Sequence, residues 1–376
     1  MSLPTTMNAV VIEGKQAVIK NDIPLPEYPT TYILVKTRAV GGNPTDWKHI
    51  EFGIGPQGSI VGCDVAGEVV SMGKDVDTSK FQLGDKVFSF AHGTCVRKPD
   101  NGAFADFVAL DSELTFKLPK DATFAESETI PEGKVSTFEE AASIPLSWFT
   151  AGGALFHEME LKFDNIDSTT PQHNYPLLVW GGATALGQAV IQLAKRYHGY
   201  SKIITVANKK KHEKQLLTYG ADEVFDYHDK DVIQQIKSKY NNIQRLFDCV
   251  STLDTLQQVY QCGPDSMDAI VVNFTSKSIN DIKPEIRKSN VSVIRTVVYL
   301  ALGYDVFMAG NKIPADSKYK EDMIKYVKEI NPRLINGEFH HPPIVVYKDG
   351  LNGAVKLTKD IQNGINVGKK LVSTFH

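Results

Sequence analysis

The segment that most constrains the fold is an apolar run that enters a glycine-rich turn and continues directly into a helical pattern. Residues 177–180 are apolar, residues 181–187 read Gly-Gly-Ala-Thr-Ala-Leu-Gly, and beyond them apolar residues recur at intervals of three and four. A strand, a tight turn and a helix in this order direct the free N–H groups of a helix N-terminus at a pyrophosphate. The spacing Gly182-x-Thr184-x-x-Gly187 is a dinucleotide-binding fingerprint with its middle glycine replaced. We therefore predict a nucleotide-binding turn made of Gly181, Gly182, Ala183, Thr184, Ala185, Leu186 and Gly187.

Two rhythms of apolar residues divide the chain. Over the first 120 residues, short apolar runs alternate with glycine and proline turns, which is typical of a mostly antiparallel β domain. From about residue 150, strands alternate with helices, which predicts a doubly wound parallel sheet of the α/β class. Its predicted strands are residues 177–180, 202–207, 223–226, 246–250 and 269–274. Residues 120–136 are rich in turn residues and are expected to form an exposed loop.

Composition excludes several classes of protein. The 376 residues are enough for two domains with separate cores. A net charge of −3 and a pI of about 6.4 give no electrostatic reason to expect a nucleic-acid or membrane partner. The N-terminus lacks the features of a signal peptide, and the cysteines Cys63, Cys95, Cys249 and Cys262 form no CxxC pair. We therefore expect a cytoplasmic protein with reduced thiols.

Ordered sequence blocks make the chain similar to the medium-chain dehydrogenases/reductases over nearly its whole length. Residues 43–48 (NPTDWK) resemble the first active-site segment of that family, and residues 61–70 (VGCDVAGEVV) resemble its GxExxGxV stretch. Residues 83–88 and 102–107 match two further family blocks, and residues 141–152 resemble the crossing into the nucleotide domain. The likeness is strongest to the zinc-independent branch, with its quinone-reductase-like proteins, fungal enoyl reductases and yeast aldehyde reductases.

The resemblance implies a two-domain fold. Members of the family combine a GroES-like, mostly antiparallel β domain with a Rossmann dinucleotide-binding domain. We accordingly expect the GroES-like catalytic domain at residues 1–149 and 303–376, and the Rossmann domain at residues 150–302. The resemblance also implies a monomer or a homodimer.

The positions at which zinc-dependent members hold their metal carry different residues here. Asn43 stands where a cysteine is expected, and Cys63-Asp64 stands where a His-Glu pair is expected. An amide oxygen binds zinc poorly, and the structural-zinc loop of four close cysteines is absent, since residues 91–101 hold only Cys95. We therefore expect an enzyme without zinc.

The end of the second Rossmann strand bears on the choice of cofactor. Enzymes that prefer NAD place a carboxylate there to bind the ribose hydroxyls, whereas this strand ends in Asn208 and is followed by Lys209-Lys210-Lys211. Cations oppose the dipole at a helix N-terminus, so three together suggest an anion, although such runs are usually only solvated. NADP(H) is favoured over NAD(H), with Asn208, Lys209 and Lys211 as ligands. Tyr227 resembles a family position beside the adenosine, or it packs at the strand end.

The candidate catalytic residues lie in the first active-site segment. Thr45 aligns with the family hydroxyl that passes a proton from the substrate oxygen towards the nicotinamide ribose, and Lys48 aligns with the next relay position. Without zinc, hydrogen-bond donors must stabilise the developing alkoxide or enolate. Asn43, Thr45 and Lys48 are the donors that the sequence offers. The alternative is that Asn43 and Thr45 only satisfy the backbone of a turn.

The resemblance implies further contacts with cofactor and substrate. Aromatic residues that could line an apolar substrate pocket are Phe52, Trp148, Phe149 and Tyr299, although aromatic residues more often belong to the core. Phe52 lies where some enoyl reductases of the family carry a tyrosine acid, and a phenyl ring cannot donate a proton. The remaining implied cofactor contacts are Thr150, Val250, Phe274, Leu302, Gly303 and Lys369.

Three functions are compatible with these residues. The first is a zinc-independent, NADPH-dependent reductase of small aldehydes, which delivers hydride to a carbonyl carbon. The second is a reductase of α,β-unsaturated carbonyls or quinones. The third is a nucleotide-dependent sensor or partner-binding protein that keeps the fold without turnover.

Overall fold

A computed structural model describes residues 3–308 and 310–376 of the chain and divides it into two compact units. The first comprises Met1–Leu146 and Tyr299–His376, and the second comprises Ser147–Val298. We call them the β unit and the nucleotide unit. The sequence had placed the boundaries at residues 149/150 and 302/303.

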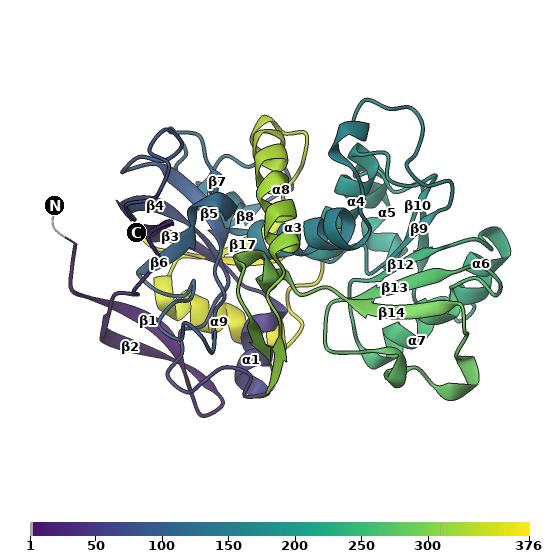
Figure 1. Cartoon of the computed structure of the whole chain (residues 1–376), viewed down its shortest axis with the longest axis horizontal. Helices are drawn as coiled ribbons and strands as arrows, with labels where there is room; N and C mark the ends of the chain where they lie inside the picture. Colours follow the sequence, from purple (N-terminus) through teal and green to yellow (C-terminus); the bar gives the residue numbers. More distant parts are fainter. Residues whose placement is uncertain (1–2, 309) are drawn as a thin grey trace. The chain divides into compact units, whose positions relative to one another are not determined.

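The nucleotide unit contains the doubly wound parallel sheet that the sequence predicts (Figure 1). Its strand order is β11-β10-β9-β12-β13-β14, and every neighbouring pair is parallel. The strands are β9 (Leu177–Trp180), β10 (Ile203–Ala207), β11 (Glu223–Asp226), β12 (Arg245–Asp248), β13 (Ala269–Asn273) and β14 (Val291–Arg295). The helices are α4 (Ala185–Arg196), α5 (Lys209–Thr218), α6 (Val232–Lys239) and α7 (Leu253–Gln261). Strands β9 to β13 are largely buried on both faces, as parallel strands between helices are.

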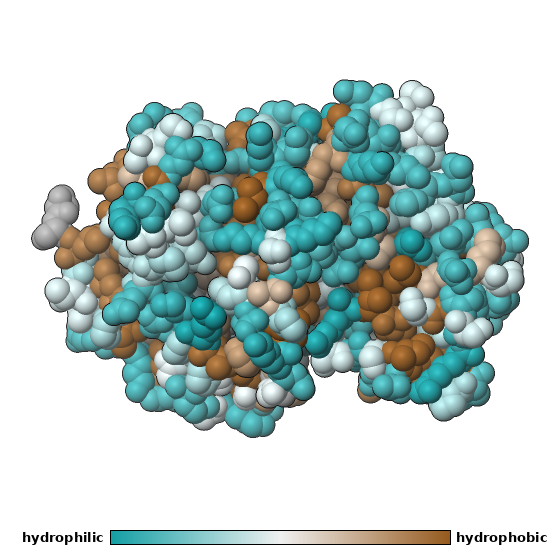
Figure 2. Space-filling view, in the orientation of Figure 1, coloured by the Kyte–Doolittle hydropathy of each residue, from teal (hydrophilic) through white to brown (hydrophobic). Residues whose placement is uncertain are grey.

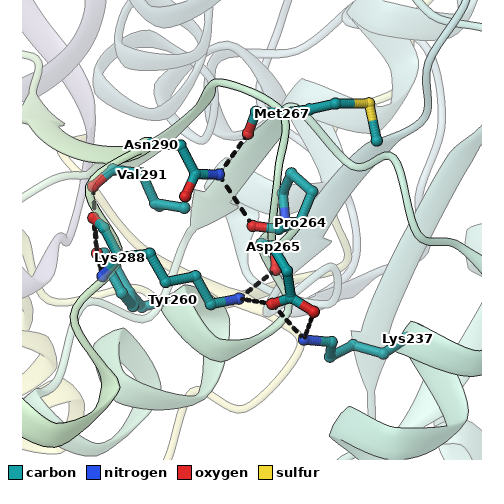
Figure 3. A network of polar contacts seen from close by, with 9 residues as sticks. Lys237, Tyr260, Pro264, Asp265, Met267, Lys288, Asn290 and Val291 are labelled. Carbon is teal, nitrogen blue, oxygen red and sulfur yellow. Dashed lines mark hydrogen bonds and ion pairs between the residues drawn. The ribbon is translucent and has the colours of Figure 1, made fainter.

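The sequence missed the sixth strand, β14, which is an edge strand with mostly half-exposed side chains. Tertiary contacts hold the connection to it (Figure 3). The Asn290 amide donates to the carbonyl oxygens of Pro264 and Met267, at 3.1 and 2.6 Å. The Asp265 carboxylate binds the ammonium groups of Lys237 and Lys288. Contacts between segments that are distant in the sequence hold β14 at the edge of the sheet. A local apolar pattern cannot reveal such contacts.

The β unit is built on one large, mostly antiparallel sheet and two hairpins. The sheet runs β7-β5-β4-β3-β18-β17-β8, and β6 also pairs with β3. Its strands are β3 (Tyr32–Gly41), β4 (Asp64–Met72), β5 (Lys86–Phe90), β6 (Phe107–Asp111), β7 (Phe116–Lys117), β8 (Thr129–Ile130), β17 (Ile344–Tyr347) and β18 (Lys370–Thr374). Two hairpins lie outside it: β1 (Thr6–Glu13) with β2 (Gln16–Pro24), and β15 (Val306–Met308) with β16 (Asn311–Ile313). These observations confirm the predicted fold class.

Helices cover this sheet and close its core. They are α1 (Pro44–Glu51), α2 (Phe138–Ala142), α8 (Ser317–Asn336) and α9 (Gly350–Gln362), and α3 (Pro145–Gly152) runs on into the nucleotide unit. Helix α9 packs against β18 and against α1, which lies close to it in Figure 1. One local prediction was incomplete. Residues 120–136, expected to be an exposed loop, contribute the short strand β8, which pairs with β17. Pro145 begins α3, since its missing N–H is tolerated in a first turn.

Apolar side chains fill the interior of each unit. One core cluster gathers residues of β1, β3, β4, β5, β6 and α9, and another gathers residues of the parallel sheet with α6 and α7. Hydrophilic side chains occupy much of the face seen in Figure 2. Among the described helices, none is both long and apolar enough to span a bilayer.

Candidate active site

The predicted nucleotide-binding turn lies between β9 and α4. Thr184 caps the helix, and its hydroxyl accepts from the N–H of Gly187 at 2.9 Å. Gly181 has a φ of +86°, which a side chain disfavours. A Cβ on Gly187 would lie 2.3 Å from the carbonyl oxygen of Gly181, so this glycine allows the helix to pack closely on the turn. The spacing of the fingerprint is thus explained by the geometry of the turn itself.

Three N–H groups of this turn are available to an anion. Within the part of the chain that the structure describes, the amides of Ala183, Ala185 and Leu186 have no hydrogen-bond acceptor. They lie at the N-terminus of a twelve-residue helix, where the dipole favours negative charge. This arrangement fits the pyrophosphate of a dinucleotide.

Beside the end of β10 lies a carboxylate that the sequence did not assign to the cofactor site. Asp226, the last residue of the adjacent strand β11, accepts from the N–H of Lys209 at 3.1 Å and from the His228 ring at 2.6 Å. Asn208 caps α5 by accepting from the N–H of Lys211, and the Lys209 ammonium lies 3.4 Å from Glu213. A carboxylate of β11 therefore lies beside the end of β10. Since Phe225-Asp226-Tyr227 is visible in the sequence, the pairing of parallel strand ends could have suggested it.

Other predicted contacts of the nucleotide unit have varied surroundings. Tyr227 is 47% exposed and Val250 is 39% exposed, while the N–H of Phe274 donates to Ser251. Thr150 lies in α3, as do Trp148 and Phe149, whose side chains are almost completely buried. Their roles toward cofactor and substrate remain predictions.

A buried ion pair occupies the positions at which the family holds catalytic zinc. The Lys370 ammonium lies 2.8 Å from Oδ2 of Asp64 and 2.6 Å from Oδ1 of Asn43. The Asn43 amide donates to the same Asp64 oxygen at 2.9 Å, and the N–H of Leu146 donates to the other at 2.6 Å. Asp64 is 0% exposed and Lys370 only 4%. Every polar atom of this cluster is thereby engaged in the fold.

Sheet register explains how residues so distant in the chain meet. Val372 of β18 pairs with Gly41 of β3 in an antiparallel ladder. Lys370, two residues before Val372, therefore comes opposite Asn43, two residues after Gly41. Gly41 also pairs with Asp64 of β4 on its other side. Lys369, which the sequence had named for the cofactor, is exposed just before β18, whereas Lys370, the first residue of that strand, is buried.

The residues at these positions do not fit a zinc ion. Asn43 and Asp64 already bind the ammonium of Lys370, and the third position is the Cys63 thiol. Burial raises the pKa of this thiol well above its usual value, which disfavours the thiolate that zinc needs. In the described residues no cluster of histidine, cysteine and carboxylate side chains could hold a metal ion. The predicted role of Asn43 as a donor to substrate is also revised, because its amide is occupied in holding Asp64 and Lys370.

A second polar group surrounds Thr45, which lies in the first turn of α1, two residues after Asn43. Its hydroxyl lies 3.0 Å from Nε2 of His49 and 3.4 Å from the hydroxyl of Tyr299. The Tyr299 hydroxyl also lies 3.3 Å from the Cys63 sulfur, and the His92 ring stacks on the tyrosine at 3.8 Å. Tyr299 was predicted as a pocket wall, but it is buried, with its hydroxyl in this network. The sequence missed His49, although residues four apart on a helix share a face.

Two more predicted residues of the β unit lie near this group in the chain. The Lys48 ammonium lies 5.7 Å from the centre of the Trp47 ring. Phe52, which follows the last residue of α1, is 67% exposed and contacts the same ring.

Leu302 and Gly303 line a cavity of about 310 Å³ together with Tyr32, His92 and Tyr304.

We expect the ion pair to be essential for folding. Lys370→Met leaves the Asp64 carboxylate buried and unpaired, which should lower the free energy of unfolding by about 3–5 kcal/mol. The double change Asp64→Asn with Lys370→Met removes both charges and should recover part of this loss. Urea denaturation followed by circular dichroism measures both variants. Equal stability of Lys370→Met and the native protein would contradict the assignment.

Asp46 should make stability depend on pH. Burial raises its pKa to about 7; the N–H of Asn43 opposes this rise, and the charge of Asp64 adds to it. Because the folded pKa exceeds the unfolded value, the native state retains a proton that the unfolded chain releases. Stability should therefore fall as the pH rises from about 4 to about 7, by up to roughly 4 kcal/mol.

Asp46→Asn should flatten this dependence, since its amide oxygen can still accept from Asn43. Asp268→Asn, at an exposed position, is the control and should leave the dependence as in the native protein. Denaturation curves at several pH values between 4 and 8 give the measurement. A native slope that persists in Asp46→Asn would show that another group titrates.

Comparison with known proteins agrees with this geometry. Residues 29–120 match the alcohol dehydrogenase GroES-like domain, and residues 185–300 match the zinc-binding dehydrogenase family. The chain is 51% identical, over 100% of its length and 99% of the relative's, to "Uncharacterized protein YNL134C" of Saccharomyces cerevisiae. It is 34% identical to trans-enoyl reductase caaB of Aspergillus niger, over 69% of this chain and 67% of that one.

A solved structure with the same fold is the quinone oxidoreductase from Coxiella burnetii. It superposes with a TM-score of 0.64 at 21% identity and covers 99% of both chains. Sequence family, strand order and the nucleotide-binding turn agree: the chain belongs to the medium-chain dehydrogenase/reductase family and is an oxidoreductase.

Proposed function

We propose that this protein is a zinc-independent, NADPH-dependent reductase of small aldehydes. The observation that carries the proposal is the pair of hydroxyl groups of Thr45 and Tyr299, held 3.4 Å apart and backed by His49. A carbonyl oxygen that receives hydride at its carbon becomes an alkoxide and needs a proton. A positioned hydroxyl network provides it without a Lewis acid.

The cofactor that the family implies fits the nucleotide unit. The amides of Ala183, Ala185 and Leu186 would hold the pyrophosphate, and Lys209 and Lys211 would meet the 2′-phosphate. The bound nicotinamide nucleotide supplies the hydride. In the β unit, the hydroxyl of Thr45 would exchange a proton with the substrate oxygen.

A second candidate is reduction of an α,β-unsaturated carbonyl, which the name of the Aspergillus niger relative favours. Hydride then goes to carbon β, and solvent can protonate the resulting enolate later. Such a reaction depends less on the Thr45 hydroxyl than aldehyde reduction does. The two functions are therefore separable by one substitution.

Thr45→Val keeps the shape of the side chain and removes the hydroxyl. Aldehyde turnover should fall about 10²–10⁴-fold, the usual contribution of a positioned acid, while cofactor affinity changes little. Steady-state kinetics with aldehydes, enals and quinones, together with fluorescence titration of the nucleotide, provide the measurement. Thr45→Ser, which restores the hydroxyl, is the control. Full aldehyde turnover in Thr45→Val would refute the role, and native preference for enals would select the second candidate.

The lysines at the start of α5 should select the phosphate. Replacing Lys209 and Lys211 by alanine should raise the dissociation constant for NADPH roughly 10- to 150-fold, because a charge-assisted bond to the phosphate of about 1.5–3 kcal/mol is lost. Binding of NADH should hardly change, and Lys214→Ala, exposed on the same helix, is the matched control. Isothermal titration of the native protein and both variants measures the dissociation constants for NADPH and NADH. A native protein that prefers NADH would instead identify Asp226 as the acceptor for the ribose hydroxyls.

A further inference from the structure

Four side chains of the β unit form one continuous line of hydrogen bonds. The hydroxyl of Tyr299 meets that of Thr45, Thr45 meets Nε2 of His49, and Nδ1 of His49 meets the hydroxyl of Thr94. Thr45 is partly exposed, whereas the other three side chains are buried. The line therefore opens at Thr45 and runs inwards from there.

The last member of the line fixes its direction. A threonine hydroxyl has one hydrogen, and that of Thr94 donates to the carbonyl oxygen of Gly93 at 2.6 Å. A carbonyl oxygen only accepts, so the bond between Thr94 and His49 must be donated by Nδ1–H of the ring. A neutral imidazole carries one N–H, which leaves Nε2 as an acceptor for the hydroxyl hydrogen of Thr45. Burial lowers the pKa of His49 to about 4, in keeping with a neutral ring.

The backbone of Thr94 supports a specific role for its hydroxyl. Its φ is +58°, in the left-handed region that a β-branched residue rarely adopts. Its N–H donates to the carbonyl oxygen of Ile60 at 2.7 Å, and its side chain is buried. Strained conformations of this kind persist where the surroundings enforce them, often at functional sites. The strain here places the hydroxyl against both His49 and the Gly93 carbonyl.

The direction of the line determines what a substrate would meet at Thr45. Because the hydroxyl hydrogen of Thr45 points to His49 while the ring is neutral, its oxygen lone pairs are then available to the hydroxyl of an alcohol. Once Nε2 is protonated, the ring donates to Thr45, and the hydroxyl hydrogen of Thr45 can bind a carbonyl oxygen. Because the Gly93 carbonyl ends the line, no proton can enter or leave at the Thr94 end. The His49 ring is consequently the place at which a proton passing through Thr45 is held.

We propose that His49, with its tautomer fixed by Thr94, exchanges the substrate proton through the hydroxyl of Thr45, and that this route replaces a relay through Lys48. The inference rests on the proposed reduction of a carbonyl. His49 and Thr94 are positioning residues, since they act through Thr45.

One proton moves in each turnover. In reduction, the alkoxide takes the hydroxyl hydrogen of Thr45 as hydride arrives at its carbon, and Thr45 takes Nε2–H from the imidazolium form of His49. The ring returns to its neutral Nδ1–H form. Its extra proton enters from solvent through the Thr45 hydroxyl before the substrate binds, since Thr45 is the one member of the line that is not buried. Oxidation of an alcohol runs the same steps in reverse.

The tautomer can be measured without substrate. In protein labelled with ¹⁵N in the histidine rings, the His49 signal is found by its loss in His49→Gln. We expect the native ring to carry its hydrogen on Nδ1, and Thr94→Val to shift population to the Nε2–H form. Thr94→Ser keeps the hydroxyl and should retain the native tautomer. Hydrogen on Nε2 in the native protein, or an unchanged tautomer in Thr94→Val, would overturn the proposal.

Turnover gives a second readout. The side chain in His49→Gln can still accept from Thr45 and donate to Thr94, but it is not basic. Aldehyde turnover should therefore fall about 10²-fold or more with little change in KM, and the solvent isotope effect on kcat should increase. A purely structural role predicts native turnover in this variant, which would overturn the proposal.

Matched threonine variants separate this role from stability. Thr94→Val should lower kcat about tenfold, as expected for one lost hydrogen bond, and Thr94→Ser should restore it. Thr37→Val removes another buried hydroxyl of the β unit, one that donates to Ala105, and should keep native kcat. Equal losses in Thr37→Val and Thr94→Val would overturn the proposal. A native enzyme with the expected tautomer but no aldehyde reduction would refute the proposed function alone.

Discussion

The ion pair between Lys370 and Asp64 is the interaction on which the organisation of the β unit depends. It joins β18, near the end of the chain, to β4, and through Asn43 it reaches the residue that precedes α1. Removing two charges from water is costly, and the pair is stable only because its remaining lone pairs are also bonded. The N–H of Leu146 and the Asn43 amide supply those bonds. The pair therefore fixes where α1 begins, and with it the position of Thr45 and His49.

The ion pair also joins the segment before α1 to strand β4. In zinc-dependent members the metal joins the first active-site segment to the β4 strand, and here the ammonium of Lys370 joins the same two segments. A fixed ammonium supplies positive charge and hydrogen bonds, but it has no open coordination position to offer a substrate. In the reaction proposed above, the hydroxyl of Thr45, two residues after Asn43, would stabilise the substrate oxygen instead.

In the nucleotide unit, the residues that shape the turn differ from those whose N–H groups are free. Gly181 and Gly187 shape the turn, through a positive φ at one and close packing at the other. The amides of Ala183, Ala185 and Leu186 have no acceptor among the described residues and fit an anion. Replacing the middle glycine by Thr184 preserves the turn and these N–H groups, because its hydroxyl caps the helix and satisfies the N–H of Gly187. The imperfect match to the motif thus has a local structural reason.

The sequence by itself determined the fold class, the family and the nucleotide-binding turn, because each depends on residues that are neighbours in the chain. Apolar periodicity predicted five of the six parallel strands, and the strand–turn–helix segment predicted the site between β9 and α4. Only the tertiary structure brought together the polar groups of the β unit. Lys370 lies 327 residues from Asn43, Tyr299 lies 254 from Thr45, and Thr94 lies 45 from His49. Sheet register and the packing of loops set these contacts, and a one-residue shift of register would turn Lys370 away from the interior. The direction of the hydrogen bonds was likewise decided by the structure, since it follows from one threonine hydroxyl held against a carbonyl oxygen.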